Sequence, residues 1–512
     1  AAGRIYLDLS DILQYKKPRE VISSFLKNAD ALMSQALKEL INRPDFETEI
    51  KKNKNSGKAL RKFFKPIVFK SIKNITYRKP EGTVEFVKSY IDKRTKEAAK
   101  AVNSAKQGIE KLEAIYKSAD FSDDFRVLLP IMAPAMLSFK ALEAQEEKLL
   151  LEHKYVDIII KGLEGNITTE MGLLVGDLAD MVRKSPDLIR EFTNEDYITL
   201  IDRINKLKDN NEFKKKFNTF IDIYDMRAAG EIDMAKDRWI ENPEPLAKAI
   251  ISIVNTSEEG IHRKEHKETI ERAKKASAEL IKEVEENHGK VKGKVVRRMV
   301  RVLRNYMPIR EHPKYLIMKL ILTYKKAFLE EARLLVEKGH LLEEKDIFYV
   351  GFWELYKAIQ NNYSLVELVK LRKEEYEHFN KLTPPRLITS DGEEIKAGYK
   401  RENLPEGALP GMPVSSGVIE GIARVITDPS KTSINKGEIL VAPFTDPGWT
   451  PLFINAAGLV MEVGGLLTHG TVVAREYGIP AVVGITEATK KIKTGQKIRV
   501  DGNAGFVMII EE

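Results

Sequence analysis

Apolar residues recur every three to four positions along most of the chain between about residue 18 and about residue 379. The stretches 96–117, 137–154 and 266–287 show this spacing, with glutamate and lysine between the apolar positions. A helix collects side chains of this spacing on one face, which can then pack against a core. The pattern predicts a large, mainly helical region, and we find no fixed-period repeat of the kind that indicates a solenoid.

The pattern changes near residue 400. The chain first passes Thr383-Pro384-Pro385 and a stretch rich in proline, glycine and glutamate. Short apolar runs bounded by turn residues then follow, which is typical of strands. These runs are 419–426, 438–442, 458–463, 481–485, 497–500 and 506–510. We therefore predict a multidomain chain, with a mainly helical domain over 1–385, a linker over 386–410 and a small α/β domain over 411–512.

The linker has two interpretations. As a flexible chain, the stretch 384–411 of roughly 28 residues would have a typical reach of about 30 Å, which would let the small domain visit separate sites. Alternatively, much of it packs on the surface and leaves only a short hinge. The sequence favours neither interpretation.

Composition narrows the class of protein. With 512 residues the chain can form two or more domains, each with its own core. It has no cysteine, which excludes disulfides, iron–sulfur clusters and thiolate zinc sites. We identify no apolar run of transmembrane length and no signal peptide, so we expect a cytoplasmic protein without membrane contact. The chain begins with Ala1, and we expect that something upstream has been removed.

The net charge of +8 is modest for this length. It indicates anionic ligands but is well short of a dedicated nucleic-acid binder. A nucleic-acid interpretation would use the lysine-rich stretch 51–78 and the arginines of 295–304 as phosphate contacts. Amphipathic helices over a core predict the same pattern, and we expect no nucleic-acid partner.

The candidate chemistry centres on His469. The apolar run 458–463 predicts a strand, two glycines predict a tight turn, and residues 471–477 predict a short helix. A helix N-terminus offers unpaired N–H groups and a partial positive charge, so it can seat an anion. A neutral imidazole can act as a nucleophile. Together these features suit a histidine that carries a phosphoryl group. The alternative is that Thr468 caps the helix and His469 is an ordinary surface residue.

The flanking residues favour the functional interpretation. Residues 468–484 resemble the phosphohistidine signature of the swivelling domain in phosphoenolpyruvate-utilising enzymes. The resemblance covers about the last hundred residues and includes the runs 411–417 and 442–451. It implies that His469 is the catalytic residue. It also implies a phosphohistidine loop that contains Gly465, Thr468 and Gly470.

Three runs in the helical region, 224–243, 304–315 and 345–355, extend the resemblance. With them the chain is similar to the rifampicin phosphotransferase family over nearly its whole length. This resemblance implies an ATP-grasp domain, a helical rifamycin-binding domain and a swivelling histidine domain. We expect only the last two here, and we expect no pyruvate-binding barrel after Glu512. The ATP-grasp domain is expected upstream, as a partner of this chain.

The reaction that the resemblance implies is a relay. The β-phosphoryl group of ATP passes to the histidine and then to the C21 hydroxyl of rifampicin, which yields AMP and phosphate and inactivates the antibiotic. ATP and Mg²⁺ are expected on the absent nucleotide-binding domain. We find no glycine-rich phosphate loop and no convincing carboxylate pair for nucleotide magnesium, so we expect no cofactor or metal on this chain.

Arg310 and Lys314 are the candidates for the acceptor site. Pro313 fits only the first turn of a helix, which predicts a helix start near 311–312 with Lys314 in its first turn and Arg310 just before it. Two cations beside a helix N-terminus suit a transferring phosphoryl group. By resemblance we assign both residues to substrate and phosphoryl binding. The alternative is a solvated basic turn.

Other signals have plainer interpretations. Met132, Met136 and Phe139 suit an apolar antibiotic pocket, but core packing explains their spacing better. Glu231 and Asp233 suit a magnesium site or an acid–base pair, but we expect a structural role, together with Arg227 and Arg238.

His262 and His266 match a zinc pattern, which a solvated helix face also explains.

Two other classes of function compete with the antibiotic phosphotransferase. One is a non-catalytic phosphocarrier module of a phosphoenolpyruvate-synthase-like system. The large helical region with Arg310 and Lys314 argues against it, because a simple carrier does not need such a region. A basic binding protein is the other, and it leaves His469 unexplained.

Overall fold

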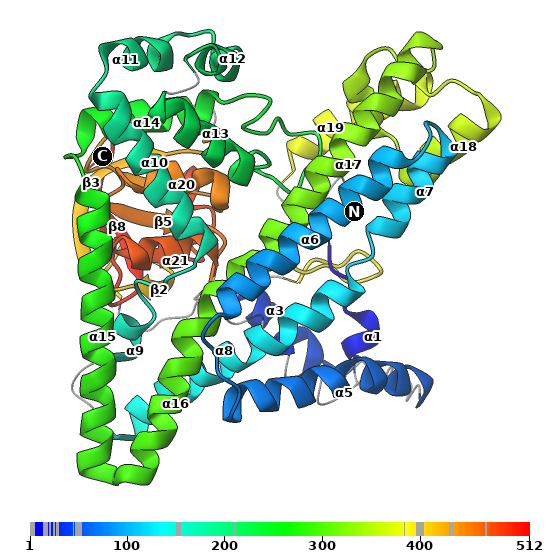
Figure 1. Cartoon of the computed structure of the whole chain (residues 1–512). Coiled ribbons are helices and arrows are strands. Elements are labelled where there is room, and N and C mark those ends of the chain that lie inside the picture. The colour runs from blue at the N-terminus through cyan, green and yellow to red at the C-terminus, as the bar shows by residue number, and fades with distance from the viewer. Residues whose placement is uncertain are drawn as a thin grey trace.

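The computed structural model describes residues 6–13, 19, 22–23, 26, 30–44, 46, 54–149, 155–208, 211–382, 384–395, 404–429, 432, 434–465 and 468–511. Helices joined by turns and loops fill the described part of the first 380 positions (Figure 1). They are α1 (Ser10–Leu13), α3 (Ala31–Ile41), α5 (Lys54–Thr76), α6 (Thr83–Ser104), α7 (Ile109–Ser118), α8 (Ser122–Leu149), α9 (Tyr155–Ile159), α10 (Ile167–Arg183), α11 (Pro186–Thr193), α12 (Leu200–Asn205), α13 (Glu212–Tyr224), α14 (Glu244–Thr256), α15 (Ile261–His288), α16 (Lys290–Tyr306), η1 (Met307–Glu311), α17 (His312–Glu337), η2 (Glu344–Tyr349), α18 (Phe352–Asn361) and α19 (Val366–Asn380).

Two large apolar cores lie in the described residues of the helical region, besides a small cluster of Met226, Met318 and Leu322. The larger one is built from α6–α9 and α15–α19, with Leu303 and Leu320 fully buried in it. Its long helices pack in pairs, α16 against α8 and α17 against α6. The smaller core is built from α10–α14 and surrounds Phe217 and Trp239. The helices predicted from the 3.6-residue apolar spacing are thus confirmed, because the helices of these cores each turn an apolar face inward.

One predicted helix is interrupted. The stretch 96–117 was expected to be continuous, but α6 ends at Ser104 and α7 begins at Ile109. Gly108 has a φ of 86°, which favours glycine, and its N–H donates to Glu331 Oε2 at 2.9 Å. The break therefore lets α7 fold back, which apolar spacing alone does not reveal.

The C-terminal part is a small α/β unit with one mixed sheet. Its strand order is β1-β8-β7-β3-β4-β5-β6-β2, and the central strands β3 to β6 run parallel. The elements are β1 (Leu409–Pro410), β2 (Met412–Ser415), β3 (Val418–Val425), β4 (Ile439–Ala442), η3 (Pro447–Trp449), α20 (Thr450–Phe453), β5 (Gly458–Met461), α21 (His469–Glu476), β6 (Ala481–Val483), α22 (Ala488–Lys491), β7 (Lys497–Asp501) and β8 (Phe506–Glu511).

All six predicted strands are present, and β4, β5 and β6 are buried on both faces. Such burial explains why they read as continuous apolar runs rather than alternating ones. The sequence did not predict β1 and β2, which lie at the two edges of the sheet and pair with β8 and β6. Only Gly411 separates these two strands, so the segment 409–415 joins both edges. The coarse prediction, a large helical part followed by a small α/β part, is confirmed.

Both ends of the predicted linker 386–410 contact folded parts of the chain. Arg386 donates to Asp30 Oδ2 at 2.8 Å and to the carbonyl oxygen of Glu462 at 2.5 Å. At the other end, β1 belongs to the sheet. Residues 396–403 lie outside the described residues.

The stretch Ile109–Lys148, which spans α7 and most of α8, is long and apolar enough to cross a membrane. The expectation that no run reaches transmembrane length is therefore wrong by this measure. In the structure α8 packs against α5 and α16, and 44% of the apolar window is buried. Helices in the core of a folded protein can be equally long and apolar.

Trp239 offers a test of the smaller core. Its side chain is 1% exposed and stacks on Phe220, with ring centroids 6.0 Å apart. Trp239→Ala should lower the free energy of unfolding by about 3–5 kcal/mol, because it leaves a large cavity. Trp353 is 56% exposed, and Trp353→Ala is the matched control. Chemical denaturation followed by circular dichroism measures both, and equal losses would contradict this packing.

Candidate phosphohistidine site

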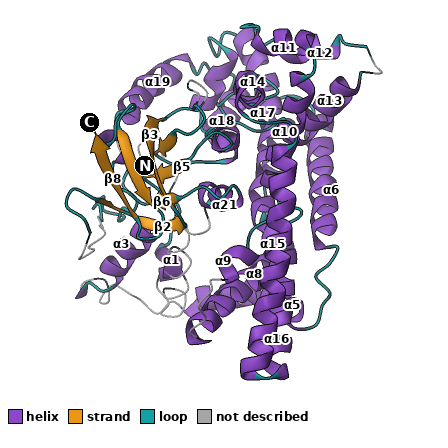
Figure 2. Cartoon of the chain, turned by 90° about the vertical axis from the view of Figure 1, so that its left-hand side faces the viewer, coloured by secondary structure: helices purple, strands orange, loops and turns teal. Residues whose placement is uncertain are grey.

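His469 is the first residue of α21, which lies between the sheet and the helical region (Figure 2). Strand β5 leads to it through Gly464-Gly465, and residues 466–467 lie outside the described residues. Thr468 occupies the N-cap position, but its side chain makes no capping hydrogen bond to the helix. Its hydroxyl instead donates to the carbonyl oxygen of Gly465 at 3.0 Å. The loop is thus closed on itself, and Thr468 leaves the N–H groups of α21 uncapped.

Gly470 permits a close approach. A Cβ at this position would lie 2.2 Å from Thr445 Oγ1 and 2.9 Å from Met461 Sδ. No side chain fits there without movement of the neighbouring loop. The three loop residues that the sequence singled out therefore all shape the start of α21.

The imidazole of His469 has a defined environment. Its Nε2 lies 3.3 Å from Thr450 Oγ1, and its Nδ1 lies 3.8 Å from Glu311 Oε2 of the helical region. The Phe453 ring meets it edge-on, with centroids 6.4 Å apart. Only 8% of the His469 side chain is exposed. The ring is therefore nearly buried between neighbours of its own unit and Glu311 of the helical region.

Arg310 and Lys314 both come to this place. Arg310 lies in η1, and α17 begins at His312 with Lys314 in its first turn, so the predicted helix start is confirmed. Arg310 donates to Glu311, and Lys314 Nζ lies 3.0 Å from Glu231 Oε1. The two cations are therefore held by carboxylates rather than free in solvent.

The sequence did not identify Glu311 and Thr450 as site residues. Glu311 stands inside the quoted run 304–315, but nothing in its spacing distinguishes it from any acidic residue at a helix start. Burial acts to raise its pKa, but Arg310, His469 and Lys314 outweigh burial and hold the pKa well below its usual range. Glu311 is thus a buried anion beside the imidazole.

Glu231 is a second buried anion. It accepts two hydrogen bonds from Arg227 Nη1, at 2.9 and 3.1 Å, and the Lys314 ion pair. Burial acts to raise its pKa, while Arg227 and Lys314 lower it further than burial raises it. Asp233 is exposed, so the two carboxylates do not form the acid–base pair that was considered. The structural role expected for Glu231 includes holding Lys314.

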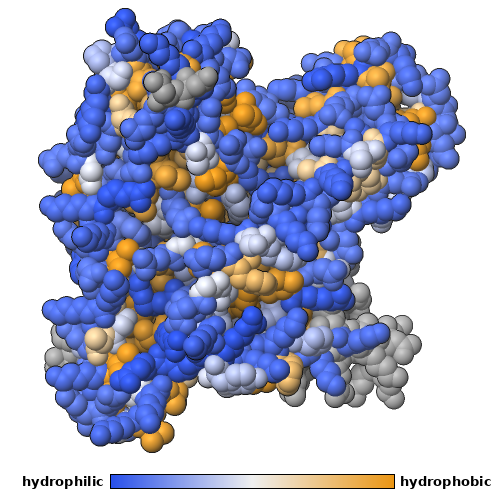
Figure 3. All heavy atoms as spheres, in the orientation of Figure 1, coloured by the Kyte–Doolittle hydropathy of each residue, from blue (hydrophilic) through white to orange (hydrophobic). Residues whose placement is uncertain are grey.

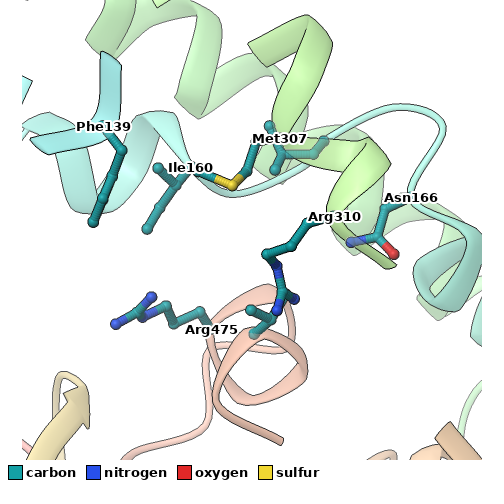
Figure 4. A pocket seen from close by; sticks show the side chains of 8 residues that line it. Phe139, Ile160, Asn166, Met307, Arg310 and Arg475 are labelled. Atoms are coloured by element: carbon teal, nitrogen blue, oxygen red, sulfur yellow. The ribbon is translucent and has the colours of Figure 1, made fainter. Parts of the chain in front are cut away.

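A small cavity of about 20 Å³ adjoins the site, with room for about one water molecule. Figure 4 shows Arg310 reaching from the helical region toward α21, and Arg475 on α21 below Phe139 and Ile160. Phe139 is 2% exposed, and Met132 and Met136 pack against the larger core. Core packing therefore accounts for this run, as expected.

The side chains considered for zinc and nucleic-acid binding contact other residues of the chain. His262 Nε2 lies 2.9 Å from Asp177 Oδ1, and the described residues contain no group of three potential ligands that could hold a metal. On α16, Arg298, Arg301 and Arg304 bind other segments of the chain. These arginines of α16 thus bind other segments of the same chain.

Comparison with known families gives two matches. Residues 127–311 match the model described as rifampicin phosphotransferase fourth domain, and residues 434–505 match the mobile domain of PEP-utilising enzymes. The first match ends at Glu311, and the second contains His469. The two sides of the site thus fall in two different family domains.

Comparison with individual proteins gives similar matches. A rifampicin phosphotransferase from Bacillus cereus is 36% identical over 518 residues, which cover 100% of this chain and 58% of the relative. Another from Bacillus subtilis is 34% identical over 526 residues, 99% of this chain and 58% of the relative. The chain is similar to rifampicin phosphotransferases along its full length. It spans 58% of the length of these two relatives. A probable phosphoenolpyruvate synthase from Staphylothermus marinus is 46% identical over 122 residues, 22% of this chain and 15% of the relative.

The Arg227–Glu231 pair yields a stability prediction. Glu231→Ala leaves Arg227, which is 1% exposed, buried without its carboxylate, and should cost about 3–5 kcal/mol of unfolding free energy at neutral pH. Because the folded-state pKa of Glu231 is lowered, its contribution is present above the unfolded-state value of about 4.3 and is lost as the pH falls through the folded-state pKa. Denaturation at several pH values measures the loss.

The control removes both charges. Arg227→Met with Glu231→Leu should cost less than Glu231→Ala, because no unpaired charge remains buried. A double variant that is less stable than the single variant would show that the ion pair itself provides the stability.

Proposed function

We propose that this chain is the antibiotic-binding and phosphoryl-delivering part of an ATP-dependent rifampicin phosphotransferase. The observation that carries the proposal is the position of His469, 3.8 Å from Glu311 and beside the cations Arg310 and Lys314. The histidine of the α/β unit thus lies where the helical region presents positive charge. Similarity to rifampicin phosphotransferases supplies the substrate class.

His469 is proposed to carry the phosphoryl group on Nε2. The ionised carboxylate of Glu311 faces Nδ1 and favours the tautomer with its proton there, which leaves the Nε2 lone pair available. The Thr450 hydroxyl lies within 3.3 Å of this lone pair and holds the ring in orientation. The start of α21 adds the partial positive charge of a helix N-terminus.

Delivery is then a transfer from nitrogen to oxygen. The P–N bond breaks as a rifamycin hydroxyl, proposed from the resemblance to be the C21 hydroxyl, forms the new P–O bond. Nε2 recovers its lone pair, and the hydroxyl proton is released. Negative charge builds on the phosphoryl oxygens, and Arg310 and Lys314 are the described cations placed to offset it. Both start from an ion pair with a carboxylate, which fixes their position.

The antibiotic is proposed to lie on apolar surface near this point. Figure 3 shows hydrophobic residues gathered on the face over α8 and α5. Exposed apolar side chains of these two helices include Leu137 of α8 and Val68 and Ile72 of α5. A large apolar ligand gains affinity by covering such surface.

Loading of the histidine is proposed to occur elsewhere. His469 is 8% exposed in the docked arrangement, so the α/β unit must leave the helical region before a donor can reach the ring. ATP and Mg²⁺ are proposed to bind a nucleotide domain outside this chain. The swivelling motion is the remaining part of the proposed relay.

The second candidate is a phosphocarrier of a phosphoenolpyruvate-synthase-like system. The 46% identity over 122 residues to a probable phosphoenolpyruvate synthase favours it. The large helical region around Arg310 favours the antibiotic phosphotransferase. Challenge of the phosphorylated chain with rifampicin separates the two: a carrier would keep its phosphoryl group.

Loading of the histidine can be tested without the nucleotide domain. Phosphoramidate, a small phosphoryl donor, should phosphorylate His469 on the undocked unit, and rifampicin should then remove the group and become phosphorylated. Peptide and small-molecule mass spectrometry follow both steps. His469→Ala should block both, whereas His288→Ala, which changes an exposed histidine, should block neither. Phosphorylated rifampicin made by His469→Ala would exclude the relay.

The acceptor site has its own test, in the assembly completed with a nucleotide domain. Arg310→Ala and Lys314→Ala should each slow transfer to rifampicin by about 10³-fold or more, because each removes charge from the transferring group. Label from β-labelled ATP should still reach His469. Lys319→Ala, one turn further along α17, is the control and should transfer normally. Wild-type turnover in the first two variants would remove them from the mechanism.

A further inference from the structure

Two carboxylates of the α/β unit reach across to the helical region, and each accepts a hydrogen bond from the backbone N–H of a glycine. Asp446 Oδ2 lies 2.8 Å from the nitrogen of Gly230, and Glu476 Oε2 lies 2.8 Å from the nitrogen of Gly162. Both glycines have positive φ, 69° and 57°. The two contacts therefore repeat one chemical arrangement at two places on the interface.

The Asp446 contact is part of a tight backbone fit. Its second oxygen, Oδ1, accepts from the nitrogen of Gly448 at 3.0 Å, so both oxygens are used. A Cβ on Gly448 would lie 2.5 Å from the carbonyl group of Ala228. The turn 446–448 thus lies directly on the loop 228–230, and Asp446 is 7% exposed.

The Glu476 contact lies at the other end of α21 from His469. Its Oε1 is closed off from solvent and has no hydrogen-bond partner among the described residues. Arg304 donates to the carbonyl oxygens of Ile159 and Gly162, which fixes the loop that presents the Gly162 N–H. A Cβ on Gly162 would meet the backbone nitrogen of Ile270 at 2.9 Å, so this loop has little freedom to shift.

We propose that Asp446 and Glu476 are positioning residues that form a two-point latch, which holds the α/β unit on the helical region with His469 against Glu311. One contact would still let the unit rotate, but two contacts far apart on it fix its orientation. Only one consequence of the latch rests on the proposed function, namely that the phosphoryl group is transferred to the antibiotic while the latch is closed. Its formation is a docking event that needs no phosphoryl group.

Closing the latch takes two carboxylates out of water, which links docking to protons. Burial raises the pKa of Glu476 to about 7, against smaller lowering effects from the N–H groups of Gly162 and Leu163 and from Arg304 and Lys161. Burial also raises the pKa of Asp446, where Glu231 adds to the rise and Lys314, the Gly230 N–H and His469 oppose it.

The raised pKa values make docking of the α/β unit weaker at high pH. A group whose pKa is higher in the docked state stabilises docking fully at pH values below its undocked pKa. This contribution is lost as the pH rises through its docked pKa. For Glu476 the window runs from its ordinary 4.5 to about 7. Docking should therefore weaken between these values.

Acylation of His469 by diethyl pyrocarbonate measures docking on the full chain, because the ring is 8% exposed when docked. Peptide mass spectrometry gives the rate at His469, and the exposed His288 serves as an internal reference for reagent and fold. Glu476→Gln keeps an oxygen for the Gly162 N–H but cannot ionise. The wild-type rate divided by the Glu476→Gln rate should rise about thirtyfold between about pH 5.5 and about pH 8.

Further variants separate a latch from a merely structural role. Glu476→Ala and Asp446→Ala should accelerate His469 acylation at every pH, with His288 unchanged. The acylation rate of Asp446→Asn should fall between those of the wild type and Asp446→Ala. The one carbonyl oxygen of the asparagine can accept a hydrogen bond from only one of the two N–H groups. A wild-type to Glu476→Gln ratio that stays flat with pH, or alanine variants with wild-type rates, would overturn the latch. Failure of His469 to accept a phosphoryl group would overturn only the proposed function.

Discussion

The pairing of buried charges in the helical region beside His469 is the constraint on which the site depends. Glu311 lies 8% exposed beside His469, and it remains an anion there because Arg310 donates to it. One turn further on, Lys314 is held by Glu231, whose other partner is the fully buried Arg227. Removing Glu231 leaves Arg227 buried without its carboxylate, which costs far more than an exposed ion pair provides.

Glycine makes close contact possible at the interface. Gly448 stands where a Cβ would overlap the backbone of Ala228, and Gly162 and Gly230 turn their N–H groups toward carboxylates. These positions do not add apolar burial. They let two backbones come close enough for hydrogen bonds across the interface, so the fit of the two parts is a matter of backbone approach rather than of side-chain packing alone.

The same interface both creates the site and closes it. His469 is only 8% exposed in this arrangement. The relay that we propose therefore needs docking that is specific and weak enough to reverse. Buried carboxylates suit this need, because each supplies a directed hydrogen bond while its desolvation limits the net stability gained.

The sequence by itself determined the elements whose signals are local. Apolar spacing predicted the long helices, continuous apolar runs predicted β4, β5 and β6, and Pro313 predicted the start of α17, because a proline fits only its first turn. The sequence also singled out His469, Arg310 and Lys314, which the fold brings together.

Only the tertiary structure decided the partners. Glu311, Thr450, Asp446 and Glu476 are ordinary polar residues in the sequence, and their neighbours lie up to 314 positions away along the chain. The edge strands β1 and β2 were missed because they contain few residues and include proline, so their pairing is set by β8 and β6 rather than by their own pattern. Burial and charge pairing are properties of the assembled fold, and no local pattern encodes which carboxylate meets which cation.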